Sequence, residues 1–102
     1  MKVANIEVPK DTIEAFCKTW NVKKFSLFGS VLRDDFRPDS DVDVVLAFGP
    51  GGVQTFENFL ELRDELSAMF GVREVDIVEK RLLRNPYRRY AILTTREVVY
   101  AA

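Results

Sequence analysis

The stretch from Asp41 to Phe48, DVDVVLAF, constrains the fold of this chain more than any other. Acidic and apolar residues alternate at its start and the remainder is apolar, which is typical of an interior strand with both faces covered. The chain has 102 residues, 47% of them hydrophobic and 30% charged, which is a globular composition and the length of one domain. We therefore expect a single folded domain over residues 1–102, built around a sheet that contains this strand.

Helix and strand patterns alternate on both sides of this strand. Apolar residues at helical spacing predict a helix over Lys10–Trp20, and residues 22–28 predict a strand that ends at Gly29. We also expect a long helix over residues 53–71, a strand over 73–80 and a short helix over 85–93. The long helix has a predicted apolar stripe and a glycine C-cap: Phe56, Phe59, Leu60, Leu66, Met69, Phe70 and Gly71. Residues 96–102 fit an extended or a helical segment. This alternation predicts an α/β or α+β fold with helices packed mainly on one face of the sheet.

The absence of histidine excludes several kinds of catalytic chemistry. Zinc sites with paired histidines, the Ser-His-Asp triad and the Cys-His dyad all need a residue that the chain lacks. Cys17 is the single cysteine, so we expect a reducing, cytoplasmic compartment. The net charge of −1 does not indicate nucleic acid, and no stretch resembles a signal peptide or approaches the roughly 20 apolar residues of a membrane helix. Catalysis would therefore depend on carboxylates, Arg or Lys, hydroxyls, or a metal ion bound by oxygen.

Asp41 and Asp43 are expected on one face of the strand, with their Cα atoms roughly 6.5 Å apart. Two carboxylates about 4 Å apart repel by around 4 kcal/mol at an effective dielectric constant of 20, and a divalent cation such as Mg²⁺ would reverse the sign of that energy. A solvated turn is the alternative interpretation of DSDVD. A calcium-binding EF-hand loop starting at Asp39 is excluded, because Val44 and Pro50 occupy its glycine and glutamate positions.

A third acid, Asp76, lies within the apolar stretch VDIV of the next predicted strand. An unpaired carboxylate is costly to bury, so Asp76 either joins the other two acids, faces solvent, or pairs with Arg73 or Lys80. If its strand is the neighbour of DVDVV, the three carboxylates form one cluster.

The Gly29–Ser30 pair lies between the strand that ends at Phe28 and a stretch, residues 30–36, long enough for one or two helical turns. Glycine lets a backbone approach a ligand closely, and amides that open a helix attract anions. Taken alone, a Gly-Ser turn is most often an ordinary turn. The phosphate-binding pattern Gly-Lys-Ser/Thr is absent from the chain.

Together, FGS, SDVD about ten residues later and VDIV on a later strand closely resemble the minimal nucleotidyltransferase family of the DNA polymerase beta-like superfamily. The resemblance covers nearly the whole chain and implies an α+β fold with a small mixed sheet. It also implies ATP as the donor, two Mg²⁺ ions, and a role as an antitoxin that transfers AMP to a tyrosine of a HEPN-type helical toxin. The implied site comprises Gly29, Ser30, Arg33 and Ser40 for the nucleotide, and Asp41, Asp43 and Asp76 for the metal ions and the acceptor hydroxyl. The sequence departs from the family pattern at Asp34, where a glycine is usual, and this puts tight triphosphate binding in question.

Two other functions are compatible with the sequence. A binding module could mask a partner by contact alone, since Tyr87, Tyr90 and Tyr100 beside Arg88 and Arg89 are residue types enriched at interfaces. These tyrosines could equally close the edge of the core. Transfer to a small molecule such as an aminoglycoside is the third possibility, although it usually needs an additional helical domain.

Overall fold

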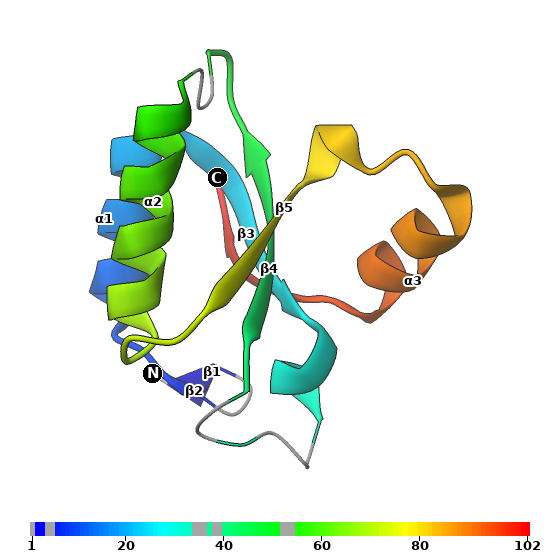
Figure 1. Ribbon diagram of the computed structural model, residues 1–102, viewed down its shortest axis with the longest axis horizontal. Coiled ribbons are helices and arrows are strands. Elements are labelled where there is room, and N and C mark those ends of the chain that lie inside the picture. The colour runs from blue at the N-terminus through cyan, green and yellow to red at the C-terminus, as the bar shows by residue number, and fades with distance from the viewer. Residues whose placement is uncertain (1, 4–5, 34–36, 38–39, 52–54) are drawn as a thin grey trace.

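The computed structural model describes residues 2–3, 6–33, 37, 40–51 and 55–102 (Figure 1). Its elements follow one another as β1 (Lys2–Val3), β2 (Ile6–Glu7), α1 (Lys10–Trp20), β3 (Val22–Phe28), the 3₁₀ helix η1 (Gly29–Leu32), β4 (Val42–Phe48), α2 (Phe56–Met69), β5 (Val75–Glu79), the 3₁₀ helix η2 (Lys80–Leu82), α3 (Pro86–Thr95) and β6 (Glu97–Ala101). The fold is α+β, as predicted. No helix in the described ranges is both long enough and apolar enough to cross a membrane.

A four-stranded mixed sheet forms the centre of the molecule, in the order β5-β4-β3-β6. Strand β4 is parallel to β5 and antiparallel to β3, and β3 is antiparallel to β6. The stretch that most constrained the fold is therefore an interior strand, as its apolar run predicted. Residues 97–101, which the sequence left open, form the edge strand β6, and the small β1–β2 hairpin was not predicted.

Helices α1 and α2 cover one face of the sheet, and α3 lies on the opposite side (Figure 1). The larger core cluster joins Ile13 and Phe16 of α1 and Leu62 of α2 to alternate residues of β4, beginning with Val42 and Val44. A smaller cluster joins Val45, on the other face of β4, to Leu83 and to Ile92 of α3. The prediction that helices pack mainly on one face is confirmed.

The predicted stripe of α2 is partly wrong. Phe56 is the first residue of the helix and is 75% exposed, whereas Leu62, which the sequence analysis did not include, is fully buried. The buried side chains Leu62, Leu66 and Phe70 follow one another at intervals of four residues, the spacing of one helix face. The helix ends at Met69 with Phe70 as its cap, one residue before the predicted cap Gly71, which has φ +79°.

Candidate active site

The face of the sheet on which α3 lies carries two rows of residues in register. In the first row, Asp43 of β4 lies between Phe28 of β3 and Asp76 of β5. In the second row, Val45 lies between Ser26 and Val78. Residues paired directly across strands point to the same face, so the Asp43 and Asp76 side chains are neighbours on one side of the sheet.

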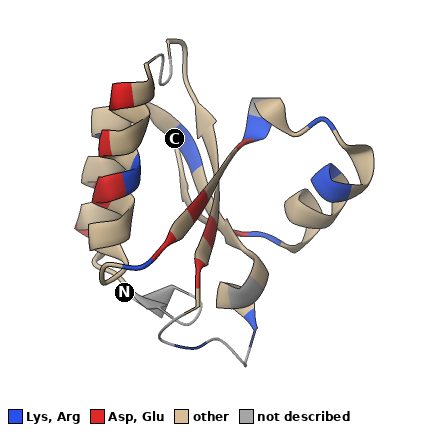
Figure 2. Cartoon of the chain, in the orientation of Figure 1, with Lys and Arg blue, Asp and Glu red and all other residues tan. Residues whose placement is uncertain are grey.

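Asp41 directly precedes β4 and is exposed, while Asp43 is half-buried and Asp76 is exposed. The backbone N–H of Val42 donates to the carbonyl of Glu74 at 3.0 Å, which fixes the register where β4 and β5 begin. Acidic residues consequently occur side by side on these two strands (Figure 2). Within the described ranges, no group of three or more acidic or thiol side chains lies close enough together to hold an ion in this conformation.

Gly29 lies against the carboxylate of Asp43. It has φ +74°, and a Cβ atom built on it would lie 2.3 Å from Asp43 Oδ2. Only glycine combines this left-handed conformation with so close an approach. The Gly29 backbone and the Asp43 carboxylate therefore form one compact unit, and the space between them would be filled by any side chain at position 29.

The other predicted nucleotide-binding residues lie in η1 or between η1 and β4 in the sequence. Ser30 belongs to η1, and Arg33 follows η1 and is exposed. Ser40 closes a turn, because its N–H donates to the Arg37 carbonyl at 3.0 Å and its Oγ accepts from the Arg37 N–H at 3.1 Å. Arg73 Nη1 donates to the same carbonyl at 3.0 Å and so ties this turn to the chain that leads into β5. Asp34, where the sequence departs from the family pattern, lies outside the described residues.

Phe28 lies in the same cross-strand row as Asp43 and Asp76, and sequence reasoning did not select it. Its signal was its position directly before Gly29, since the last residue of an antiparallel strand lies opposite a residue near the start of its partner. Phe28 is half-buried and also packs against the smaller core cluster. Its side chain is on the same face of the sheet as that of Asp43, to which it is paired directly across the strands.

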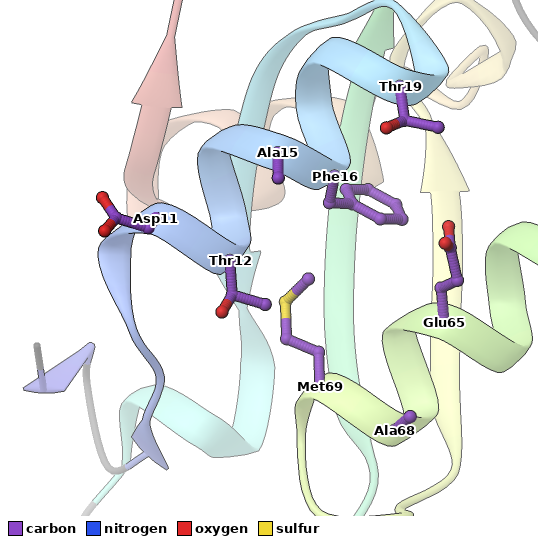
Figure 3. A pocket seen from close by; sticks show the side chains of 8 residues that line it. All are labelled: Asp11, Thr12, Ala15, Phe16, Thr19, Glu65, Ala68 and Met69. Carbon is purple, nitrogen blue, oxygen red and sulfur yellow. The ribbon is translucent and has the colours of Figure 1, made fainter.

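A separate hollow of about 610 Å³ lies between α1 and α2 (Figure 3). Phe16 and Met69 face each other in it, and Asp11 and Glu65 lie nearer its ends. Because α1 and α2 cover the opposite face of the sheet from Asp43 and Asp76, this hollow is not part of the acidic site. Its charged lining residues are acids, which is unfavourable for a phosphate-bearing ligand.

Comparison with known proteins agrees with the resemblance seen in the sequence. Residues 10–99 match the nucleotidyltransferase domain family. The protein adenylyltransferase MntA of Thermococcus cleftensis is 35% identical over 81 residues, which cover 79% of this chain and 76% of that protein. The chain belongs to the nucleotidyltransferase family, and the family is one of enzymes.

Solved structures similar to this one include a minimal nucleotidyltransferase and a toxin–antitoxin structure. A minimal nucleotidyltransferase of 33% identity superposes with a TM-score of 0.68, covering 86% of both chains. A toxin–antitoxin structure with AMP-PNP superposes with a TM-score of 0.70 at 16% identity, covering 93% of this chain and 75% of that one. The second likeness is one of fold alone. The α+β fold with a small mixed sheet is therefore that of the minimal nucleotidyltransferases.

Proposed function

We propose that this chain transfers AMP from ATP to a hydroxyl group of a partner protein and thereby acts as an antitoxin. The observation that carries the proposal is the register of Asp43 with Asp76, beside a glycine that leaves room only for the Asp43 carboxylate. The relative from Thermococcus cleftensis is a protein adenylyltransferase, which supports ATP as donor and protein as acceptor. A solved structure at 17% identity contains a tri-AMPylated HEPN toxin of Shewanella oneidensis in complex with an MNT antitoxin, which supports a HEPN-type toxin as the acceptor. The acceptor hydroxyl that we propose is that of a tyrosine.

The carboxylates of Asp41, Asp43 and Asp76 are the type of ligand that two Mg²⁺ ions require. Mg²⁺ is bound in proteins through one or two carboxylates together with substrate phosphates, and Asp43 and Asp76 are neighbouring carboxylates with Asp41 two residues before. Asp41 and Asp43 would hold the ions, with Asp76 sharing one of them. When bound, such a pair of ions neutralises the charge that develops on the attacking and leaving oxygens.

In the proposed reaction, the oxygen of the acceptor hydroxyl forms a bond to the α-phosphorus of ATP. The bond between that phosphorus and the oxygen bridging to the β-phosphate breaks, and pyrophosphate leaves with the electron pair. The hydroxyl proton passes to Asp76, which is exposed and so can release it to water. Gly29 and Ser30 hold the β- and γ-phosphates through their backbone, with Arg33 and Ser40 nearby in sequence.

The test is transfer of label from α-labelled ATP to a purified HEPN-type toxin protein, with Mg²⁺ present. Wild-type protein should label the partner, and Asp43→Asn should abolish the label while its circular dichroism spectrum stays that of the wild type. Glu61→Gln, an exposed acid on α2, is the matched control and should label normally. Equal labelling by Asp43→Asn and wild type would refute the assignment.

Neutralisation of the partner separates this proposal from the binding module. If the double variant Asp41→Asn/Asp43→Asn still neutralises the toxin as the wild type does, contact alone is sufficient and the transfer reaction is not the basis of antitoxin action.

A further inference from the structure

Helix α3 and its flanking segments are strongly cationic in a chain that is otherwise acidic. From Lys80 to Arg96 the sequence contains no Asp or Glu and has these six basic residues: Lys80, Arg81, Arg84, Arg88, Arg89 and Arg96. The rest of the chain has nine basic residues against all 16 acids. The basic positions lie on η2, on α3 and on the segments that join them to the sheet, and two acids adjoin them, Glu79 of β5 next to Lys80 and Glu97 of β6 next to Arg96 (Figure 2).

The basic residues near the base of α3 repel one another. The pKa of Lys80 is lowered, first by partial burial of its ammonium group and then by the positive charges of Arg96, Lys24 and Arg89. Arg89 has a structural role as well, since its Nη1 donates to the carbonyls of Lys80 at 3.3 Å and Leu83 at 3.4 Å. Repulsion of this kind is relieved when an anionic surface binds.

The outer side of α3 exposes large aromatic side chains. Tyr87 is 86% exposed and Tyr90 is 73% exposed, and their spacing of three residues places them next to each other on the helix. Ile92 is the one buried residue of α3. Exposed tyrosines flanked by arginines are the side chains most enriched in the energetic centres of protein interfaces.

Helix α3 also lies next to the candidate active site. Ile92 belongs to the same buried cluster as Val45, which follows Asp43 by two residues on the same face of β4. Two residues of a strand span roughly 6.5–7 Å. A protein bound to the outer side of α3 would therefore have to extend past this helix, about 10–12 Å across with its side chains, to bring a hydroxyl group to the Asp43–Asp76 pair.

We propose that Arg84, Tyr87, Arg88 and Tyr90 form the docking surface for a carboxylate-rich surface of the protein that supplies the acceptor hydroxyl. This inference rests on the proposed function, because it assigns the surface that brings that partner to the site. A protein fits better than a nucleic acid, because a continuous phosphate backbone passing the site would meet Asp41, Asp43 and Asp76. The carboxylates of a folded partner protein can lie against the arginines of α3 without also lying near the three acids.

The test uses two double charge reversals that change the net charge equally. Arg84→Glu/Arg88→Glu alters the docking surface, and Lys10→Glu/Lys18→Glu alters exposed positions of α1 on the opposite side of the sheet. Acids at the start of a helix interact favourably with its dipole, so the first variant should keep α3 folded. A third variant, Tyr87→Ala/Tyr90→Ala, removes aromatic surface that is mostly exposed and should also fold.

Binding to the same purified HEPN-type toxin protein is measured by calorimetry, with ATP binding as a parallel readout. We expect the α3 reversal and the tyrosine variant to weaken partner binding by at least about tenfold, and the α1 reversal to change it less than about twofold. All variants should bind ATP as the wild type does. Binding of the partner by the wild type should also weaken as salt is raised.

The outcomes separate this inference from the proposed function. Partner binding and labelling unchanged by the α3 variants would overturn the docking surface and leave the transferase intact. Loss of partner binding in those variants, with no labelling by the wild type, would support the surface and refute the transferase. Failure of the wild type to bind the partner would overturn the inference. So would binding of a nucleic acid, measured with labelled oligouridine, if the wild type binds it and only the α3 reversal loses that binding.

Discussion

Gly29 shows how one residue serves both the fold and the candidate site. Its φ of +74° carries a strain penalty for any other residue, and a Cβ would lie 2.3 Å from Asp43 Oδ2 and 3.2 Å from Asp43 Cγ. The carboxylate is the end of a rotatable side chain, so it would turn away more readily than the backbone would shift. The main consequence of a substitution is therefore a misplaced carboxylate rather than an unfolded protein.

We predict that Gly29→Ala lowers AMP transfer by about 100-fold, the typical cost of a displacement near 1 Å in a catalytic group. Its cost in stability should be only about 1–2 kcal/mol, mainly from the left-handed backbone. Gly71→Ala is the matched control, because Gly71 has φ +79° and nothing within 4 Å of the added Cβ. The two variants should show similar urea midpoints, and only the first should lose activity; equal activity would mean that the Asp43 position does not matter.

Cys17 is a buried thiol whose pKa is raised by burial to about 12 from an ordinary value of 9.0. The unfolded chain releases this proton near pH 9.0, while the folded chain retains it until about pH 12. The contribution of Cys17 to the free energy of unfolding is therefore constant below pH 9.0 and is lost as the pH rises between these two values.

Cys17→Ala should lack this part of the pH dependence. Urea midpoints of wild type and variant, measured between pH 8 and pH 11, should run parallel at first and then converge as the wild type loses stability. Lysines and tyrosines titrate in both proteins and cancel in the difference. Curves that stay parallel up to pH 11 would show that the thiol is not shielded in the folded state.

Among the elements, those defined by local pattern were predictable and those defined by long-range pairing were not. The bounds Lys10–Trp20 of α1 follow from the 3.6-residue period, and the interior position of β4 follows from its apolar run. Strand β6 is five residues long with mostly exposed side chains, so its extended form depends on pairing with β3, which no local pattern encodes.

The candidate site divides along the same line. Asp41 directly precedes β4 and Asp43 is its second residue, so the expectation of a common face for them needs only the two-residue period of an extended chain. The alignment of Asp76 with Asp43 depends on β5 pairing in parallel with β4, and the contact of Gly29 with Asp43 depends on the antiparallel register of β3. The resemblance to a family supplied these relations before the structure did. Physical reasoning from the residues left Asp76 with three alternatives.

Helices α2 and α3 have similar N-caps but different anchoring to the core. Thr55 Oγ1 accepts from the Asn58 N–H at 3.0 Å, and Asn85 Oδ1 accepts from the N–H groups of Tyr87 and Arg88 at 3.0 and 3.1 Å. Helix α2 buries two residues, Leu62 and Leu66, whereas α3 buries only Ile92. The unfolding of α3 can therefore occur locally, while that of α2 would disrupt the main core.

We predict that Thr55→Ala and Asn85→Ala have distinct effects although each removes a cap worth about 1 kcal/mol. Thr55→Ala should lower the global free energy of unfolding by about that amount. Asn85→Ala should instead speed amide hydrogen exchange within α3 and leave exchange in β3 and β4 unchanged. A loss of protection in the central strands of Asn85→Ala would contradict local opening of α3.

At the scale of the whole molecule, charges of opposite sign are separated across one face of the sheet. Asp41, Asp43 and Asp76 lie at the start of β4 and β5, and six cations lie on and around α3, although the net charge is only −1. Glu79 at the end of β5 and Glu97 at the start of β6 are the acids next to these cations in the sequence. In the proposed function this separation is useful, because the acidic end would bind cations and the basic end would bind an acidic partner. Each end would then respond differently to ions in solution.

The stability of the whole domain should therefore depend on Mg²⁺, because Asp41, Asp43 and Asp76 would bind the ion in the folded state. An ion bound by the folded chain alone, at ten times its Kd, adds about 1.4 kcal/mol. In a domain of this size that raises Tm by roughly 6–11 °C. Asp76→Asn should have a higher Tm than the wild type in EDTA, because one of two neighbouring negative charges is removed. Its Tm should rise less than that of the wild type when Mg²⁺ is added. Glu61→Gln, on α2, is the control and should respond to Mg²⁺ as the wild type does. The Tm values are measured by differential scanning fluorimetry. An equal Mg²⁺ response in all three proteins would show that Asp76 does not bind the ion.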